Sequence, residues 1–359
     1  MGDPIQIAIA GIGAVSEKHA AAVSELDDAL IVAGSCRTAE KGQAFAAEHD
    51  AAWFDDTEDM LDTVQPDVLI VCTPSGAHLE PTLAALNRDI HVLCEKPLEI
   101  TTDRIDQMIA AAASSPAMLG GIFQQRFNDV MNEIESVARA GRFGDLATAN
   151  AYVPWWRDDT YYVDAWQGTQ ALDGGGALMN QSIHAIDVVQ WLAGTAIGSD
   201  SDQNPVDEVM AYTDRRCHDA NLMSVEDTAV ACLRFQDGTL GQLLGSTGMY
   251  PGTRRRLQIG GRNGTVEVLE DELITWAFRD ESPKDESIRT QYGEGESASG
   301  AADPMAISHE LHRRNIATFL ECLTADAPNP VSAREARKAV AIIEAIYASA
   351  ARGEPVSVD

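Results

Sequence analysis

The chain has 359 residues and a formal net charge of −30, from 56 acidic and 26 basic residues. A chain this negative is repelled by nucleic acids and anionic membranes, so neither is expected as a partner. Its length suits two folded domains, and no apolar run approaches the roughly 18 residues needed to cross a bilayer.

The first third of the chain alternates short apolar runs with helical patterns. The apolar runs, predicted as strands, are Gln6–Ala10, Leu30–Gly34, Val68–Cys72, His91–Cys94 and Met118–Phe123. The helical patterns are Ser16–Leu26, Ala39–Glu48, Leu79–Asn87 and Thr102–Ala113. Strands that alternate with helices predict an α/β domain with a parallel sheet covered on both faces, over residues 1–123.

The pattern changes in residues 124–359, for which we predict an α+β domain. Helices are expected at Val130–Ala140, in Asp173–Leu192 after a glycine turn, and at His309–Leu323 and Ala333–Ala351, the last of which can pack back on the first domain. Strands are expected at Leu146–Val153, Thr228–Phe235, Thr239–Ser246, Arg255–Ile259 and Thr265–Leu269. The turns Asp237-Gly238 and Asn263-Gly264 favour hairpins and hence an open antiparallel sheet. The polar stretch Glu281–Asp303 is predicted to be a loop.

A glycine-rich turn follows the first predicted strand. Gly11 allows a tight turn, and Gly13 lets a pyrophosphate approach the start of the helix, where N–H groups and the helix dipole favour anions. Ala14 and Val15 follow, and Ser16 stands where the dinucleotide fingerprint has its third glycine. The turn is typical of a Rossmann dinucleotide-binding domain, although a plain strand–turn–helix would have the same spacing.

The end of the second predicted strand bears on which dinucleotide binds. In NAD-binding domains an acidic residue there accepts a hydrogen bond from the ribose 2′-hydroxyl. Here the strand runs into Ser35, Cys36, Arg37 and Thr38, with no carboxylate. Pairing of Arg37 with a 2′-phosphate favours NADP over NAD, whereas the alternative is a solvated surface arginine.

Several motifs occur together in an order that resembles one family. Downstream of the glycine turn come Thr73-Pro74, His78, Glu95-Lys96-Pro97, the triple-glycine segment Asp173 to Asn180, and His184-Ala-Ile-Asp187. With Arg142-Phe-Gly-Asp145, the Gly260 to Gly264 hairpin and Glu344-Ala-Ile-Tyr347, they cover nearly the whole chain. The combination resembles the Gfo/Idh/MocA oxidoreductases, the family of glucose–fructose oxidoreductase and inositol dehydrogenase.

The resemblance implies a role for each matching residue. Lys96 would be the catalytic lysine, with a cis bond before Pro97, and His184 the catalytic acid/base. Asn180 and Asp187 would bind or orient the substrate. The residues implied at the cofactor are Thr73, Pro74, His78, Glu95, Lys96, Pro97 and Arg126, beside Gly11, Gly13, Ala14, Val15, Ser35, Cys36 and Arg37.

One position departs from the family's pattern. Many relatives carry an aspartate where this chain has Asn180, four residues before His184 and so expected on the same helix face. An amide can hydrogen-bond a hydroxyl but cannot accept a proton, so proton transfer is expected to rest on Lys96 and His184. Oxidation of a secondary alcohol needs such a pair, a base that titrates near neutrality and an ammonium that stabilises the developing alkoxide. A packed histidine and a solvated lysine are the alternatives.

An aromatic and polar cluster follows the expected first domain. The residues predicted to bind substrate are Trp156, Arg157, Tyr161, Tyr162 and Trp166, next to Trp155, Asp158, Asp159 and Thr160. Rings that stack on C–H faces beside polar groups that bind hydroxyls are typical of a sugar or polyol pocket. The same composition fits an aromatic core or a subunit interface equally well.

We therefore expect a dehydrogenase that uses NADP or NAD to oxidise a secondary alcohol of a sugar, sugar derivative or cyclic polyol. Two other classes stay open: a glycosidase that holds NAD for transient oxidation, known among these relatives, and a non-catalytic NADP-binding or sensing protein. The resemblance implies a homodimer or homotetramer formed through the C-terminal sheet. No metal site is expected.

Charge and cysteines bear on the cellular setting. Lysine occurs only at positions 18, 41, 96, 284 and 338, and many carboxylates with few lysines suggest a halophilic source. The six cysteines show no C-x-x-C spacing and are expected as buried, reduced thiols. The N-terminus lacks the features of a signal peptide, so a cytoplasmic location is expected. No partner is assigned to His19, His49, His91, His218, His309 or His312, which are expected on the surface or in packing.

Overall fold

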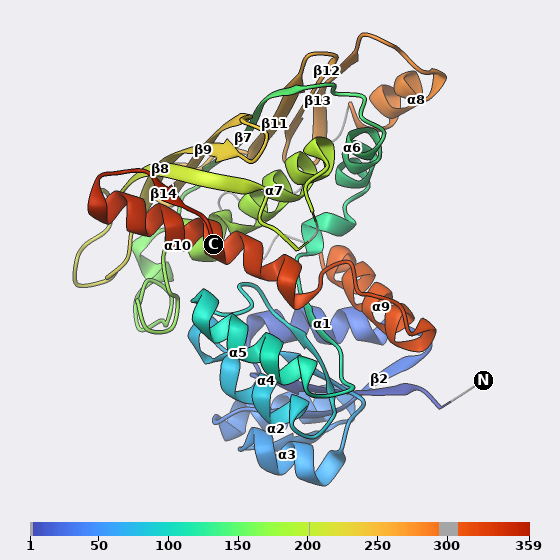
Figure 1. Cartoon of the computed structure of the whole chain (residues 1–359). Helices are drawn as coiled ribbons and strands as arrows, with labels where there is room; N and C mark the ends of the chain where they lie inside the picture. The colour runs from blue at the N-terminus through green and yellow to red at the C-terminus, as the bar shows by residue number, and fades with distance from the viewer. Residues whose placement is uncertain (1–2, 201, 294–307) are drawn as a thin grey trace. The chain divides into compact units, whose positions relative to one another are not determined.

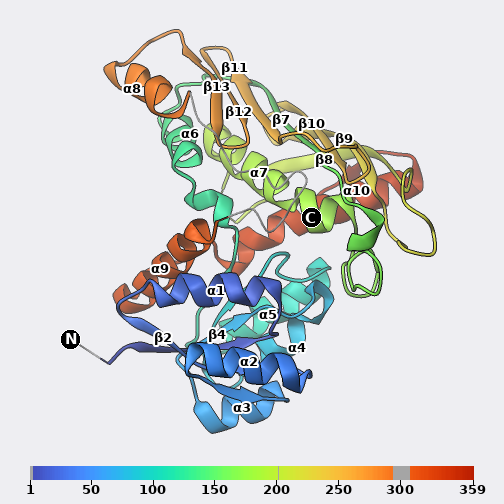
Figure 2. The same cartoon turned by 180° about the vertical axis from the view of Figure 1, so that it is seen from behind.

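The computed structural model describes residues 3–200, 202–293 and 308–359. Its contacts divide the chain into two compact units, drawn in Figures 1 and 2. The first unit is Met1–Gln124 with Ser308–Arg337, and the second is Gln125–Ile307 with Lys338–Asp359. A segment from near the C-terminus thus belongs to the N-terminal unit.

A parallel six-stranded sheet forms the centre of the first unit, with strand order β3-β2-β1-β4-β5-β6. Its strands are β1 (Ile5–Ala10), β2 (Ala29–Ser35), β3 (Ala52–Phe54), β4 (Val68–Val71), β5 (His91–Cys94) and β6 (Leu119–Gly121). Its helices are α1 (Ala14–Ser24), α2 (Ala39–His49), α3 (Thr57–Val64), α4 (Leu79–Leu86), α5 (Thr102–Ala113) and α9 (Glu310–Ala325). Figure 1 has α4 and α5 in front and Figure 2 has α1 and α2 in front, so helices cover both faces. The predicted α/β Rossmann class is confirmed.

The central strands are apolar because helices cover them on both sides. All four residues of β4 are buried, as are Ile7 and Ile9 of β1. Ile316, Phe319 and Leu320 of α9 join the same core, and α9 packs against α1. Burial of each such side chain contributes about 1.5–3 kcal/mol. The first unit therefore depends on residues from the far end of the chain.

A mixed eight-stranded sheet dominates the second unit, with strand order β13-β12-β11-β7-β10-β9-β8-β14. Its strands are β7 (Leu146–Pro154), β8 (Val206–Asp214), β9 (Thr228–Phe235), β10 (Leu240–Ser246), β11 (Arg256–Gly261), β12 (Gly264–Leu269), β13 (Glu272–Phe278) and β14 (Val356–Ser357). Strands β7 and β10 are parallel, and the other neighbours are antiparallel. The hairpins expected at Asp237-Gly238 and Asn263-Gly264 both form, as β9–β10 and β11–β12. The parallel pair is the one departure from the predicted antiparallel sheet.

One face of this sheet is buried and the other is open. In β9, Ala229, Ala231 and Leu233 are buried, whereas Val230 and Arg234 are exposed. The helices of the second unit are α6 (Asp129–Arg139), α7 (Ile183–Ile197), α8 (Pro283–Tyr292) and most of α10 (Ala333–Arg352). Helix α7 packs against β7, β11 and α6, as Figure 2 shows. Within the described ranges, no helix has both the length and the apolar character to cross a membrane.

Three expectations need correction. The loop predicted over Glu281–Asp303 is wrong for Pro283–Tyr292, which form α8 because Ser282 and Asp285 make a capping box and proline occupies the first turn. Residues 294–303 of that stretch lie outside the described residues. Strands β8 and β13 were not predicted at all, although their burial alternates as in a half-covered strand. The cysteines are free, but Cys217 and Cys232 are exposed rather than buried.

Candidate functional site

The glycine turn after β1 combines a crowded position with an open one. Gly11 has a φ of 93°, and a Cβ there would lie 2.6 Å from the Thr73 backbone nitrogen and 2.7 Å from the Cys72 carbonyl carbon. Only glycine fits, so the ends of β1 and β4 approach closely. A Cβ at Gly13 would meet no atom of the described residues within 4 Å. That open space lies at the N-cap of α1, where the phosphates of a dinucleotide fit.

Ser16 takes the place of the third glycine and closes the start of α1. The Gly13 N–H donates to Ser16 Oγ at 2.9 Å, and the Ser16 hydroxyl donates to the Gly13 carbonyl oxygen at 2.7 Å. Ser16 is buried, while Ala14 and Val15 are exposed. The first N–H groups of a helix have no intrahelical acceptor, so those of Ala14 and Val15 can bind a phosphate. The residues present therefore fit a dinucleotide.

His78 connects the ends of β4 and β5. Its Nε2 lies 2.8 Å from the Thr73 carbonyl oxygen, and its Nδ1 lies 2.8 Å from the Pro97 carbonyl oxygen. Burial lowers the pKa of His78, and the two carbonyl acceptors oppose that shift only in part. The peptide bond between Lys96 and Pro97 is cis, as the resemblance implied. These residues lie at the carboxyl edge of the sheet, where open α/β sheets bind ligands.

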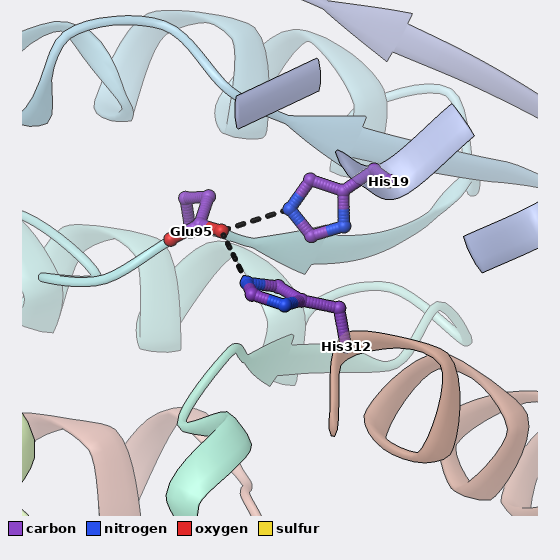
Figure 3. Close-up of side chains that lie close together, drawn as sticks. All are labelled: His19, Glu95 and His312. Atoms are coloured by element: carbon purple, nitrogen blue, oxygen red, sulfur yellow. Dashed lines mark hydrogen bonds and ion pairs between the residues drawn. The ribbon is translucent and has the colours of Figure 1, made fainter. Parts of the chain in front are cut away.

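Glu95 is held by histidines from both ends of the chain, as Figure 3 shows. His19 Nε2 donates to Glu95 Oε1 at 2.8 Å, and His312 Nε2 lies 3.8 Å from the same oxygen. Glu95 Oε2 accepts a hydrogen bond from the Lys96 N–H at 2.9 Å. Burial alone would raise the pKa of Glu95, but the His19 hydrogen bond and the electrostatic effects of His19, His312 and, last, Lys96 outweigh burial and hold this pKa well below its usual range.

Each of the six histidines to which the sequence assigned no partner contacts a polar group in the structure. His19 and His312 are buried against Glu95, so of the two expected roles the surface one is wrong, and each packed ring has a polar partner that the sequence did not indicate. Sequence could not pair them because they lie far from Glu95 along the chain. The remaining contacts are surface ion pairs of His49 with Glu17 and of His309 with Glu25, and a hydrogen bond from the Met118 N–H to His91 Nδ1.

The residues after β2 present one exposed charge. Ser35 is buried, and its hydroxyl shares a hydrogen bond of 2.9 Å with Thr57 Oγ1. The Cys36 carbonyl oxygen accepts from the Trp53 indole N–H at 3.2 Å. The side chain of Arg37 is exposed. Of this segment, Arg37 is thus the residue that can meet a charged ligand.

In the second unit, the glycine run before α7 lets two other segments approach closely. A Cβ at Gly175 would overlap the Tyr347 hydroxyl, and one at Gly176 would overlap the Glu226 carbonyl oxygen. The Glu226 carboxylate accepts hydrogen bonds from Gly176 N–H at 3.0 Å, Leu178 N–H at 2.9 Å and the Tyr347 hydroxyl at 3.0 Å. Burial raises the pKa of Glu226, and these donors oppose the shift. Glu226, which the sequence analysis missed, therefore fixes the segment that leads into α7.

That segment, Ala177–Ser182, is π-helical rather than part of the expected α-helix. The α-helical spacing begins only at Ile183, so Asn180 lies in the π-helical turn and His184 in the first turn of α7. Asn180 Nδ2 donates to Asp173 Oδ1 at 2.6 Å, and the side-chain oxygen Asn180 Oδ1 accepts from Gln181 Nε2 at 3.1 Å. His184 is half-buried in the first turn of α7. Short π-helical turns occur frequently at functional sites.

Asp187 and Arg126 form a buried ion pair with two hydrogen bonds, Nε to Oδ2 at 2.8 Å and Nη2 to Oδ1 at 2.6 Å. Gln190 Nε2 also donates to Asp187 Oδ1 at 3.3 Å. The Arg126 guanidinium lies 5.3 Å from the centre of the Trp191 ring. The pair anchors α7 close to His184, a positioning contact that the sequence did not indicate.

Arg157 lies at the centre of the aromatic cluster. Its Nη1 donates to the Trp156 carbonyl oxygen and its Nη2 to Gln181 Oε1, both at 2.8 Å. The guanidinium lies 5.2 Å from the Trp155 ring centre and 5.8 Å from that of Tyr161. Contacts of this kind stabilise a buried arginine. Arg157 is therefore rigidly placed, as a residue that recognises a ligand must be.

Other members of the cluster belong to the core. Tyr162 is buried, and its hydroxyl donates to Thr247 Oγ1 at 3.2 Å. Burial raises the pKa of Tyr162. Trp155 is buried as well, whereas Trp156 and Trp166 are half-buried. The cluster is thus an aromatic core with half-buried rings at its border.

A histidine–aspartate pair that the sequence analysis missed supports the same segment. His218 Nδ1 lies 3.1 Å from Asp227 Oδ2, and its Nε2 lies 2.9 Å from the Arg157 carbonyl oxygen. Burial lowers the pKa of His218, but these two acceptors outweigh it and the net shift is upward. Asp227 also accepts from three successive backbone N–H groups, those of Arg216, Cys217 and His218. The short distance in sequence between an aspartate and a histidine is the signal that could have revealed the pair.

The fold and the glycine turn define a two-unit protein with a Rossmann dinucleotide-binding unit. Residues 5–122 match the family described as "Oxidoreductase family, NAD-binding Rossmann fold", and residues 138–358 match "Oxidoreductase family, C-terminal alpha/beta domain". The chain belongs to the Gfo/Idh/MocA oxidoreductase family, and its first unit binds NAD(P).

Individual relatives agree with this assignment. D-glucoside 3-dehydrogenase of Escherichia coli is 29% identical over 248 residues, 66% of this chain and 68% of the relative. Myo-inositol 2-dehydrogenase of Thermotoga maritima is 24% identical over 274 residues, 73% of this chain and 74% of the relative. The solved structure of the WlbA dehydrogenase from Bordetella pertussis, in complex with NADH and UDP-GlcNAcA, is 28% identical with a TM-score of 0.88, covering 100% of this chain and 99% of that one.

Proposed function

We propose that the protein oxidises a secondary alcohol of a sugar, sugar derivative or cyclic polyol, reversibly and with NAD(P). The observation that carries the proposal is the position of Lys96, on a turn held by Glu95 at the same sheet edge as Gly11 and Gly13. The relatives named as D-glucoside and myo-inositol dehydrogenases support this substrate class.

Each proposed catalytic residue has one task. The nicotinamide supplies the acceptor for the hydride that leaves the carbinol carbon. The Lys96 ammonium donates a hydrogen bond to the substrate hydroxyl and stabilises the negative charge that develops on its oxygen. His184 accepts the hydroxyl proton, so alcohol becomes ketone, hydride and one proton. Asn180, whose amide already bonds Asp173, orients a hydroxyl and moves no proton.

We further propose that Arg157 and the half-buried rings Trp156, Tyr161 and Trp166 bind the substrate. The two hydrogen bonds of Arg157 and its contacts with aromatic rings support a fixed recognition site. Tyr162 takes a supporting part because it is buried against Thr247. Rings that stack on C–H faces and a guanidinium that donates to hydroxyls or carboxylates suit sugars and sugar acids.

Activity on a panel of sugars, inositols, glycosides and nucleotide-linked sugar acids tests the proposal, with nicotinamide reduction as the readout. We expect turnover on at least one member, and a fall in kcat of about 10²–10⁴-fold in Lys96→Met and His184→Asn. NAD(P) binding should persist in both variants. Lys41→Met, an exposed lysine on α2, is the matched control and should leave kcat unchanged. Dinucleotide binding without turnover on any substrate would contradict the proposal and leave a binding protein.

The preference between the two dinucleotides has support on each side. The exposed Arg37 and the lack of a carboxylate at the end of β2 support NADP. The NADH in the WlbA complex supports NAD. Calorimetric titration with each dinucleotide decides the matter. Tighter binding of NADP, lost in Arg37→Ala, would establish the phosphate contact, whereas tighter binding of NAD would refute it.

We also propose that the open face of the eight-stranded sheet forms a contact between copies of the chain. Val230, Leu240 and Ile274 are exposed on strands of this sheet, together with Tyr212, which is 72% exposed. Exposed apolar groups on one surface are typical of subunit interfaces. Light scattering should give a dimer or tetramer, and Tyr212→Lys should weaken it. A monomeric wild-type protein would overturn this proposal.

A further inference from the structure

The carboxylate of Glu95 joins three elements of the first unit at the residue before Lys96. Glu95 follows β5, His19 lies in α1 behind the glycine turn, and His312 lies in α9 (Figure 3). None of the three residues is more than 6% exposed. Burial of a carboxylate is strongly unfavourable unless it is paired. The burial and pairing of the Glu95 carboxylate therefore indicate a specific role for this residue next to Lys96.

The two oxygens of Glu95 have separate partners. Oε1 lies 2.8 Å from His19 Nε2, and because an ionised carboxylate only accepts, His19 must carry a proton on Nε2. Oε2 accepts from the Lys96 N–H at 2.9 Å. At the following residue, the Pro97 carbonyl oxygen lies 2.8 Å from His78 Nδ1. The turn that carries Lys96 is thus fixed on both of its sides.

His312 covers the carboxylate without adding charge. Burial lowers the pKa of His312 to about 3, so its ring is neutral. The ring packs edge-on against that of His19, with centroids 5.1 Å apart at 84°. Its Nε2 faces Glu95 Oε1 at 3.8 Å. His312 therefore restricts both partners of the His19–Glu95 hydrogen bond.

We propose that His19 and His312 are positioning residues, which hold Glu95 beside Lys96 and so fix the Lys96 backbone and ammonium for alcohol oxidation. The inference rests on the proposed function, because it assigns the two histidines a part in that reaction. A substitution that removes the Glu95 charge or the His19 N–H donor should then displace Lys96 while leaving the direct contacts to substrate and dinucleotide in place. The other titratable groups that interact electrostatically with this cluster are Cys72, Cys94, His78, Lys18 and His309.

Two imidazoles and a carboxylate are also metal ligands, and their ligand atoms lie within 4.8 Å of one another. A metal bound through both Nε2 atoms would leave an N–H on each Nδ1, and metal-bound histidines normally donate that N–H to a partner. The Nδ1 atoms of His19 and His312 are buried with no hydrogen-bond partner in the described part of the chain. The hydrogen-bonded arrangement is therefore favoured over a metal site.

Chemical labelling of Lys96 tests the proposal without requiring turnover. The chain has only five lysines, so acetic anhydride labelling at each pH can be read for every one of them by mass spectrometry. In Glu95→Gln, the pH of half-labelling of Lys96 should fall by about 1 unit, because the neighbouring anion is lost. In His19→Leu it should fall by less, because the carboxylate remains but is no longer held beside Lys96. Lys41 and Lys284 should not change. His19→Gln keeps an N–H donor and should restore the wild-type value, and His312→Phe should give a smaller shift.

Kinetics on the same proteins complete the test. We expect kcat to fall by up to about 10²-fold in His19→Leu, with NAD(P) affinity unchanged, because the lysine is misplaced. The matched control is His49→Leu, which breaks a surface His–Glu pair of 3.3 Å in the same unit and should change neither labelling nor kcat.

Each outcome is decisive. A loss of kcat without a shift in Lys96 labelling would show a merely structural role and overturn the proposal. A loss of kcat that is accompanied by an equal loss of dinucleotide binding and of stability would overturn it in the same way. Stoichiometric binding of added zinc that His312→Phe abolishes would overturn it in favour of a metal site. If the wild-type protein turns over no substrate but the variants show the labelling shift, the proposed function is refuted while the placement of Lys96 is supported.

Discussion

The guanidinium of Arg126 and the carboxylate of Asp187 form a bidentate ion pair inside the second unit, and their side chains are only 5% and 0% exposed. Two parallel N–H···O bonds give the pair a fixed orientation. Loss of one partner leaves an uncompensated buried charge. We expect Arg126→Met to lower the free energy of unfolding by about 3–5 kcal/mol, measured by urea denaturation.

Two further variants separate this effect from simple loss of a charge. The pair of Arg216 with Asp214 is 69% and 63% exposed, so Arg216→Met should cost no more than about 1 kcal/mol. The double variant Arg126→Met/Asp187→Leu removes both charges and should recover part of the loss. Equal costs at the buried and exposed pairs would contradict our interpretation.

The two glycines of the dinucleotide turn should respond differently to alanine. Gly11→Ala places a Cβ 2.6 Å from the Thr73 nitrogen at a positive φ, so it should destabilise the protein by at least about 1–2 kcal/mol. Gly13→Ala meets open space among the described residues and should change stability by less than about 0.5 kcal/mol. It should nevertheless weaken NAD(P) binding, because the Cβ occupies the place of the phosphates. Thermal melts and calorimetry on both variants check this, and unchanged dinucleotide affinity in Gly13→Ala would argue against the assigned binding position.

The pair of His218 with Asp227 predicts a pH-dependent contribution to stability. Burial lowers the pKa of His218, but the Asp227 and Arg157 acceptors raise it above its ordinary value of 6.5. A group whose pKa is raised by folding stabilises the protein fully below the unfolded pKa, and the contribution is lost as pH rises through the folded pKa. The melting temperature of the wild type minus that of His218→Phe should therefore be largest below about pH 6 and shrink at higher pH. A difference that grows with pH would contradict the assignment.

The net charge of −30 predicts that salt stabilises the protein. Repulsion among surface carboxylates is screened when the Debye length falls to roughly 3 Å at 1 M salt. We expect the melting temperature to rise steadily from dilute buffer to molar KCl, as a halophilic origin requires. Comparable stability and activity in dilute buffer would remove the case for such an origin.

Local pattern was enough to predict the sheets but not all their strands. The apolar runs around Ile7 and Ile70 stand out because helices enclose these strands on both faces. Strand β8 escaped notice because its exposed positions carry Asp207 and Tyr212 without a turn signal that defines its ends. Helix α8 escaped because its polar composition resembles a loop, although Ser282 and its capping box mark the start.

The residues at the site divide in the same way. Gly11 and Lys96 could be located from sequence because their motifs are contiguous. The partners of Glu95 could not be, because α1 and α9 are brought to β5 only by the packing of the whole unit. The π-helical turn at Asn180 depends on the approach of Glu226 to the glycine run, another contact that sequence spacing does not encode.

The place of α9 in the first unit has a consequence for how the chain folds during synthesis. When Met1–Gln124 have been synthesised, every strand of the Rossmann sheet exists. Phe319, which packs in the core of the first unit, and His312, which covers Glu95, have not yet been made. Until those residues are synthesised, α1 and the apolar core beside it lack the cover that α9 provides. We therefore expect the Rossmann unit to complete its packing only after α9 has been synthesised.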